Sequence, residues 1–469
     1  MRLLLFIILY LQSFQICAQS QPTTAIIRDF IFEGNRKTKT KVLAREFTMG
    51  VGDTIPLSEL AIKLEENRLR LLNTNMFNDV KINVKNWTFD DKVSIVISVV
   101  ERWYFFPIPI FELADRDFNV WWKEQNRDLR RTNYGVRLTH SNVSGRRDPL
   151  SALIQFGYTP KFSLSYSFPY FDKKQTTGAF VNYLYSTNRE IGYATVNNRV
   201  VFFRNPLKNI SSRLSYSGGI TYSPGLFDKH VWTFGYSKQI LDTSVTATLN
   251  RDYFLNSRTV QAFSWLSYNY SNDTRDFKPY PMKGHFMSLN VHKAGLFKAD
   301  NPHTLNLNIR WSQYTKLSQK ISLETVARGK TTPIRNELPY NFQRGVGYGG
   351  DYIRGYELFV VDGYDFGILK NSLRFQLIDR DYDLSRYTKN KLLKSWEVLP
   401  IKTFLTANLD LGYSYTPQYK PTNDFNNRLL YGGGIGLDFL AFHGMLWQFE
   451  YSFNHKGQHG FYLHYQSNF

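Results

Sequence analysis

Two different hydrophobic periods divide this chain. Between residues 24 and 101 a helical period lies between strand-like stretches, whereas from residue 103 onward apolar and polar residues alternate one by one. The stretch KFSLSYSFPYF shows the second period, because its aromatic and aliphatic side chains from Phe162 to Tyr170 fall on one face and its serines on the other. Such alternation is typical of a β-strand with one apolar and one polar face.

The alternation predicts sixteen strands, an even number as a closed antiparallel barrel requires. Serine, threonine and arginine on the polar face suit a polar lumen, and the apolar face suits lipid. Two long interruptions, at residues 223–258 and 330–366, are expected on the outer side of the membrane. The first contains the strand-like stretches VWTFGYS and SVTATL, so eighteen strands is the alternative. The expected strands lie near residues 118–124, 132–141, 150–157, 161–170, 177–187, 191–204, 210–222, 259–272, 284–294, 303–314, 319–329, 367–379, 402–414, 429–440, 444–454 and 460–469.

The pattern of apolar residues over 24–101 predicts one small α+β domain with the order β-α-α-β-β. An apolar strand, Ile26 to Phe32, is followed by a short helix after Thr40. A second helix begins at Ser58 and carries leucines along one face. Two further strands, Phe77 to Val84 and Val93 to Val99, complete the domain. The barrel is then expected over residues 103–469.

The first eighteen residues predict a signal peptide. Arg2 gives a short positive region, Leu3 to Leu11 an apolar one, and Cys17-Ala18 a small-residue cleavage site. Lipid attachment at the cysteine is disfavoured, because the residues FQI before it are not small. Cys17 is the only cysteine. Cleavage after Ala18 therefore leaves an exported protein that has no disulfide to stabilise it.

Composition and charge both favour a membrane barrel. Past the signal peptide, no stretch reaches the roughly 18 uninterrupted apolar residues of a transmembrane helix. Aromatic residues make up 16% of the chain, which suits the aromatic girdles at the two membrane interfaces. The net charge of +19 lies mostly after residue 102. In an exported barrel, contact with anionic lipid headgroups explains this charge better than nucleic acid does, so no nucleic-acid partner is expected.

The chain shows no motif of a catalytic or metal site. The glycine-rich stretch RGVGYGGDYIRGYE, Arg344 to Glu357, contains the spacing G-x-G-x-x-G, but no βαβ unit surrounds it, so we do not expect it to bind a nucleotide. Neither H-E-x-x-H nor G-x-S-x-G occurs. His455, His459 and His464 are interpreted as polar loop and lumen residues. We therefore expect no enzyme, metal or cofactor, with an outer-membrane hydrolase as an open alternative.

Two short motifs resemble those of the BamA/TamA-type outer-membrane protein insertases, a superfamily with one or more POTRA domains before a 16-stranded barrel. Ile353-Arg354-Gly355-Tyr356 resembles the V-R-G-[F/Y] motif of the sixth outer loop. Asn408 to Gly412, with Asp410 at its centre, resembles the [F/G]-x-D-x-G motif of the thirteenth strand. The resemblance implies that the loop folds into the lumen, where Arg354 pairs with Asp410, and that residues 24–101 form one POTRA domain.

Two further parts of the chain carry residues that the resemblance assigns to recognition. The last strand resembles the signal by which barrel precursors are recognised, and the edge strand of a POTRA domain docks clients or partners by strand addition. The terminal signal comprises Gln458, Gly460, Leu463, Tyr465 and Phe469, and the POTRA edge comprises Val80, Lys81, Ile82, Asn83 and Val84.

The resemblance implies an outer-membrane assembly, insertion or translocation factor of a Gram-negative bacterium, with its POTRA domain in the periplasm. Its partners would be outer-membrane lipid, unfolded barrel or secreted clients, and periplasmic proteins or lipoproteins bound by the POTRA domain. Clients would pass a seam between the first strand, Phe118 to Lys123, and the last, Phe461 to Phe469. The alternatives are a dedicated secretion pore, which passes its client through the lumen, the hydrolase, and a structural barrel without transport activity.

Overall fold

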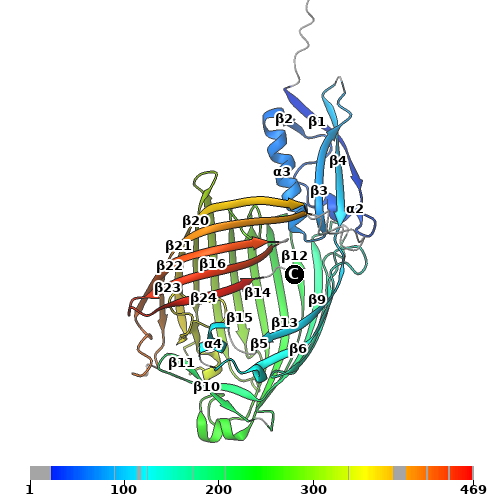
Figure 1. The fold of residues 1–469 in the computed structure, drawn as a ribbon. Coiled ribbons are helices and arrows are strands. Elements are labelled where there is room, and N and C mark those ends of the chain that lie inside the picture. Colours follow the sequence, from blue (N-terminus) through cyan, green and yellow to red (C-terminus); the bar gives the residue numbers. More distant parts are fainter. Residues whose placement is uncertain are drawn as a thin grey trace, which may run out of the picture.

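The computed structural model describes residues 23–88, 90–113, 118–123, 125–172, 174–205, 207–335, 337–383, 398–418, 421–441 and 444–466. It consists of a small N-terminal domain on one end of a large barrel (Figure 1). We call that end of the barrel the near end and the opposite one the far end. The expected signal peptide, residues 1–18, lies outside the described residues.

The N-terminal domain is a four-stranded sheet with helices on one face. Its sheet order is β2-β1-β4-β3, in which β1 and β4 are parallel and the other neighbours antiparallel. The three-residue strand β2 was not predicted. Apolar side chains of α3, including Leu60 and Leu71, pack against Ile27 and Ile95 of the sheet. The elements are β1 (Thr24–Glu33), α2 (Thr40–Ala44), β2 (Thr54–Pro56), α3 (Leu57–Asn73), β3 (Phe77–Lys85) and β4 (Lys92–Glu101).

The barrel wall is one antiparallel sheet of sixteen strands, which confirms the predicted fold class. Neighbours in the sheet follow the chain, and one long far-end loop, residues 332–364, separates the eleventh strand from the twelfth. The strands are β5 (Phe105–Leu113), β6 (Thr132–His140), β7 (Leu150–Gly157), β8 (Lys161–Phe168), β9 (Thr177–Asn188), β12 (Ser211–Tyr222), β13 (Asp228–Leu241), β14 (Val260–Asp273), β15 (Gly284–Ala294), β16 (Thr304–Lys316), β17 (Ile321–Thr331), β20 (Asp365–Asp383), β21 (Val398–Tyr415), β22 (Leu429–Ala441), β23 (Met445–Asn454) and β24 (His459–Gln466).

The first strand of the barrel is not where the sequence placed it. Residues 118–123 form a short helix, α4 (Phe118–Lys123), in a far-end loop, and Trp121 Nε1 donates to the carbonyl of Asp128 at 3.1 Å. The strand is β5, whose sequence FFPIPIF hid it, since proline removes a ladder donor and argues against a central strand. Proline is nevertheless tolerated on an edge strand. The prediction of a strand at 118–124 is therefore wrong.

Two other strand predictions are wrong in ways that offset one another. Residues 191–204 are not a barrel strand but a separate far-end hairpin of β10 (Glu190–Val196) and β11 (Arg199–Arg204). Asn197 and Asn198 form its turn with φ of 53° and 58°, the left-handed conformation that suits a two-residue hairpin. The interruption at 223–258 instead contains a barrel strand, β13, followed by the π-helical turn η2 (Val245–Leu249). The count of sixteen thus stands, and the alternative of eighteen does not.

The N-terminal domain is attached to the near-end turns of the barrel. The side chain of Asn73 donates to the carbonyl of Asp276 at 2.9 Å, and Glu46 lies 3.4 Å from Arg147. The Arg45 guanidinium stacks 3.6 Å from the centroid of the Tyr170 ring. These polar contacts join the two parts without merging their apolar cores.

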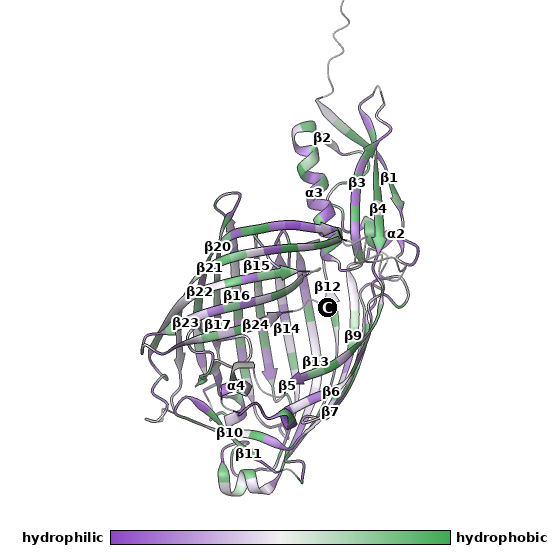
Figure 2. Ribbon diagram, viewed as in Figure 1, coloured by the Kyte–Doolittle hydropathy of each residue, from purple (hydrophilic) through white to green (hydrophobic). Residues whose placement is uncertain are grey.

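Hydropathy alternates along the barrel strands, as Figure 2 shows. Large apolar side chains such as Phe111, Phe234 and Phe461 are exposed on the outer face. Inward-facing neighbours are polar and buried, among them Asp410 and Ser452. Among the described helices, none has the length and apolar character needed to cross a membrane.

We expect the N-terminal domain to fold alone, because its apolar cluster is built from its own residues and Tyr104. In that isolated domain, Leu71→Ala should lower the free energy of unfolding by about 2–5 kcal/mol, since Leu71 is fully buried. The matched change Ile62→Ala lies on the exposed face of the same helix and should stay within about 0.5 kcal/mol. Urea unfolding measures both, and equal midpoints would contradict the assigned core.

Candidate functional site

The candidate site is the place where the long far-end loop meets the inner face of the barrel. Glycines allow this close approach. Gly355 has φ +84°, and a Cβ there would lie 2.4 Å from the carbonyl oxygen of Phe453. A Cβ on Gly432 would lie 2.1 Å from the carbonyl oxygen of Arg354. Loop backbone and wall backbone therefore touch at positions where only glycine fits.

Arg354 makes four polar contacts with three groups on the inner wall. Its Nη1 lies 2.8 Å from Asp410 Oδ1, and its Nε lies 3.0 Å from Glu450 Oε1. Its Nη2 donates to Ser372 Oγ at 3.1 Å, and its backbone N–H donates to Asp410 Oδ2 at 3.0 Å. The structure thus brings together the two residues that the motifs paired, and adds β20 and β23 to the contact. Such a planar, multiply bonded guanidinium fixes orientation as well as position.

The charges of this site are buried and nearly balanced. Arg354 is 7% exposed, Glu450 1% and Asp410 0%. Lys370 supplies the second positive charge, with its Nζ 3.6 Å from Asp410 Oδ2 and 3.8 Å from the Tyr352 ring centroid. Burial lowers the pKa of the loop residue Arg354. The negative charges of Glu450 and Asp410 raise it by more than burial lowers it, so the pKa of Arg354 lies above its usual value. Removing one member would leave an uncompensated buried charge.

An apolar cluster holds the loop on either side of Arg354. Ile353 and Tyr356 are fully buried, and the Tyr356 hydroxyl bonds to Nδ1 of His455. Gly412 allows the contact of Ile353 with the wall, because a Cβ there would lie 2.2 Å from Ile353 Cδ1. The cluster comprises Val346, Ile353, Tyr356, Val361, Ile368, Phe425 and Leu430. The motif residues Ile353, Arg354, Gly355, Tyr356, Asp410 and Gly412 therefore all lie at this one contact.

A carboxyl group of the loop joins the same network. Ligand atoms of Glu357, Glu450 and His464 lie within 4.8 Å of one another. Burial raises the pKa of the loop residue Glu357 to about 8. Because Glu450 is already paired with Arg354 and lies 3.5 Å from His464 Nε2, we interpret the three as part of the Arg354 network. The three histidines near the last hairpin have separate partners, since His455 bonds to Tyr356 and the exposed His459 contacts the carbonyl of Gly457.

A second segment enters the lumen from the near end. Tyr280 stacks on Phe404 with 4.4 Å between ring centroids, and its hydroxyl donates to Asp438 at 2.8 Å. Arg374 bonds to Glu324 and donates to the carbonyl of Pro281 at 2.9 Å. Arg374 and the Arg354 partner Ser372 are inward neighbours on β20. Segments from both ends of the barrel are thus fixed to a continuous polar stripe inside it.

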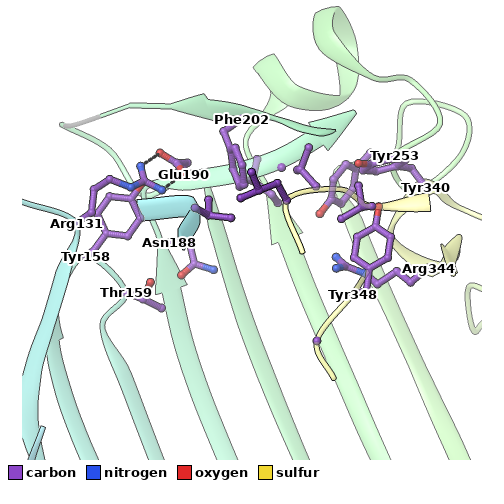
Figure 3. A pocket seen from close by; sticks show the side chains of 17 residues that line it. Arg131, Tyr158, Thr159, Asn188, Glu190, Phe202, Tyr253, Tyr340, Arg344 and Tyr348 are labelled. Atoms are coloured by element: carbon purple, nitrogen blue, oxygen red, sulfur yellow. Dashed lines mark hydrogen bonds and ion pairs between the residues drawn. The ribbon is translucent and has the colours of Figure 1, made fainter. Parts of the chain in front are cut away.

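The far-end loops enclose a cavity of about 330 Å³ (Figure 3). One wall carries the ion pair of Arg131 and Glu190, whose two contacts measure 2.6 and 2.7 Å. Tyr340, Arg344 and Tyr348 of the long loop form the opposite wall in the same view. The hairpin β10–β11 lies against the loop here, since Asn198 accepts the N–H of Val360 at 2.8 Å. The cavity is a gap between loops that otherwise cover the far end.

The two predicted recognition strands lie at sheet edges. β3, which carries Val80, Lys81, Ile82, Asn83 and Val84, is an edge of the N-terminal sheet, with Lys81 and Asn83 exposed. β24 is one end of the barrel sheet and holds Gly460, Leu463 and Tyr465. Gln458 lies in the preceding turn, where its side chain accepts from Asn454 at 2.9 Å. Phe469 lies outside the described residues.

The seam between the sheet ends differs from the prediction. Its first strand is β5 rather than residues 118–123, and within the described residues no ladder joins β5 to β24. The helix α4 instead lies against β24, where Lys123 Nζ is 5.2 Å from the centroid of the buried Tyr462 ring. A far-end loop thus covers part of the inner face of the last strand.

Sequence reasoning missed three wall residues that bond directly to Arg354 or to Asp410, namely Glu450, Lys370 and Ser372. The signal was present in the alternation of WQFEYS, which puts Glu450 on the polar face of its strand. The sequence could not show that this strand lies beside the loop.

The comparisons with known proteins agree with this architecture. Residues 25–102 match the POTRA family model, described as the surface antigen variable number repeat, and residues 142–374 match the Omp85 superfamily domain. BamA from Haemophilus ducreyi lacking POTRA domains 1–3 is 15% identical at a TM-score of 0.53, covering 94% of this chain and 84% of that one. CdiB from Escherichia coli is 13% identical at a TM-score of 0.56, and the match covers 94% of this chain and 76% of that one. None of the curated proteins matches this chain.

We expect Arg354→Ala to release the long loop while the barrel still folds. Breaking a buried ion pair on one side costs about 3–5 kcal/mol, so cleavage of the loop by chymotrypsin should rise by at least about a hundredfold. Arg335→Ala is the matched control, because Arg335 lies in the same loop and pairs with Asp365 at 2.8 Å while half exposed. Such a pair is worth about 0–1 kcal/mol. Equal cleavage of both variants would contradict the anchoring role.

Proposed function

We propose, from the premise that this chain belongs to the Omp85 superfamily, that it assembles or exports other proteins at the outer membrane through the seam of its barrel. Members of this superfamily are outer-membrane assembly or transport factors that act without enzymatic chemistry. In this protein we assign the uptake of client strands to β5 and β24, and we propose that it needs no cofactor. The observation that carries the proposal is a barrel wall whose two end strands share no ladder within the described residues.

An open seam is a chemically active place in a membrane. The N–H and C=O groups of a strand edge need partners, and hydrocarbon supplies none. An incoming strand of a client can supply them by adding to the edge. The seam can therefore take up a strand without any covalent step.

The segments that fill the lumen favour the seam, and not the lumen, as the path of the client. Arg354 anchors the long loop on β20, β21 and β23, and Tyr280 and Pro281 bring a near-end segment into the same interior. A client passing through the lumen would have to break the buried Arg354 pairs. The secretion-pore alternative therefore needs a large rearrangement that the seam route does not.

We assign residues 24–101 to a POTRA domain in the periplasm and residues 103–469 to the barrel, after a signal peptide at 1–18. The partners we propose are outer-membrane lipid, unfolded barrel or secreted clients, and periplasmic proteins or lipoproteins. The free edge of β3, with Lys81 and Asn83 exposed, supports strand addition as the mode of docking.

Locking the seam should stop the activity. We expect an oxidised cysteine pair, with one member in residues 105–113 and the other in 459–466, to block insertion of an unfolded barrel protein into lipid vesicles, and reductant to restore it. Only pairs with Cα atoms about 4.4–6.8 Å apart can bridge, so the scan itself maps the seam. After removal of Cys17 with the signal peptide, no native thiol interferes.

The control for this scan is the pair Phe234→Cys with Leu266→Cys, which are outward-facing partners in the existing ladder of β13 and β14, away from the seam. Its oxidation should leave insertion unchanged. Full activity in a quantitatively bridged seam would exclude the seam route and favour the secretion pore.

A further inference from the structure

The two strand edges that face each other across the seam are not equivalent. β5 carries Pro107 and Pro109 near its centre, and proline has no backbone N–H. Whether this matters for the seam depends on which edge of β5 these residues face. In an antiparallel ladder, alternate residues direct both N–H and C=O to one neighbour, and the residues between them direct theirs to the other.

The hydrogen bonds next to β5 settle the direction. Ser141 N–H donates to the carbonyl of Tyr104 at 2.8 Å, one step before the register that pairs Phe105 with His140. Even-numbered residues of β5 therefore bond to β6, and odd-numbered ones face the seam. The hydrogen bonds on the other side of β6 agree with this assignment. Tyr158 N–H donates to the carbonyl of Thr132 at 3.0 Å, so even-numbered residues of β6 bond to β7 and odd-numbered ones bond to β5.

Pro107 and Pro109 thus face the seam and not β6. The edge of β5 offers carbonyl acceptors there but lacks two consecutive donors. Both prolines leave the ladder with β6 intact, which explains how they are tolerated in a barrel strand. Pairing of β5 with any strand is correspondingly weakened at its centre.

The edge of β24 keeps all its donors. Asn454 N–H donates to the carbonyl of Gln458 at 2.9 Å, in line with the register that pairs Phe453 with His459. Even-numbered residues of β24 therefore bond to β23. The residues that face the seam with both N–H and C=O are His459, Phe461, Leu463 and Tyr465.

We propose that β24, and not β5, is the edge to which a client strand adds, and that Pro107 and Pro109 keep β5 from sealing that edge. This inference rests on the proposed seam function and names the strand that performs it. The prolines make closure of the seam poor in hydrogen bonds, while β24 stays ready to pair along its whole length.

The surroundings of β24 define the partner as a strand of another membrane barrel. Phe461 and Tyr465 are 70% and 56% exposed on the outer, lipid-facing side. On the inner side Tyr462 is buried beneath Lys123 of α4. A segment that continues this sheet must carry apolar residues outward and small or polar ones inward, which is the alternation of a barrel strand.

A proline at Leu463 tests the edge directly. Leu463→Pro removes a donor that faces the seam and leaves the bonds of β24 to β23 in place, whereas Leu463→Ala keeps the donor. The probe is a urea-unfolded eight-stranded outer-membrane barrel protein added to phosphatidylethanolamine and phosphatidylglycerol vesicles that contain the full-length protein. We expect probe folding to be accelerated far less by Leu463→Pro than by Leu463→Ala, because the two variants lose the same side chain and only the proline also lacks the seam-facing N–H. Equal acceleration by both variants would overturn the inference.

A second measurement applies even if Leu463→Pro fails to fold. A photoreactive phenylalanine analogue at position 463 should cross-link to the same probe, and one at position 111, which faces the seam on β5 and leaves both prolines in place, should not. Adducts from 111 alone would assign the template to β5 and overturn the inference.

The reciprocal change restores the missing donors. Pro107→Ala combined with Pro109→Ala should let β5 pair with β24, which would slow probe folding and raise the yield of seam disulfides. Faster probe folding in this variant would contradict the inference. A wild-type protein that does not accelerate probe folding at all would contradict the proposed function itself, whereas acceleration that is insensitive to position 463 contradicts only the choice of edge.

Discussion

The need to pair every backbone N–H and C=O inside a membrane governs this structure. Hydrocarbon offers no hydrogen bonds, so a sheet can cross it only where each strand has a neighbour on both sides. The fourteen strands between β5 and β24 meet this condition. The two end strands meet it on one side only, among the residues that the structure describes. The proposed activity follows from that single exception, because an unpaired edge in a membrane favours any strand that can complete it.

In the interior of the barrel, in contrast to the seam, the buried charged side chains of the Arg354 site are paired. Arg354 and Lys370 lie among the carboxylates of Asp410 and Glu450, so the charge brought by the loop meets opposite charge on the wall. Breaking such a buried set on one side is expensive, about 3–5 kcal/mol. The molecule therefore combines a fixed interior with a wall that can be opened, and this division favours movement of clients along the wall.

Alternation of hydrophobic and polar residues was enough to predict a barrel and most of its strands, and the helical period before residue 102 predicted the small domain. It failed where turn or edge chemistry interrupts the pattern. Pro107 and Pro109 hid the first strand although an edge tolerates them, and the Asn197-Asn198 turn split one expected strand into a hairpin. The pairing of Arg354 with Asp410 came from a family resemblance. Glu450 could not be added from sequence, because its nearness to the loop depends on how β23 and the loop lie in space.

Amide hydrogen exchange on the full-length protein in lipid nanodiscs, resolved by residue, distinguishes an open wall with a fixed interior from a closed wall with an open lumen. A fixed interior predicts slow exchange for the N–H of Arg354, which is bonded to Asp410 at 3.0 Å inside the barrel. An open seam predicts faster exchange for the seam-facing N–H groups of Phe461, Leu463 and Tyr465 than for those of Tyr462 and His464 on the same strand, which bond to β23. Protection of all five groups on β24 together with rapid exchange at Arg354 would contradict both predictions, because the wall would then be closed and the lumen open.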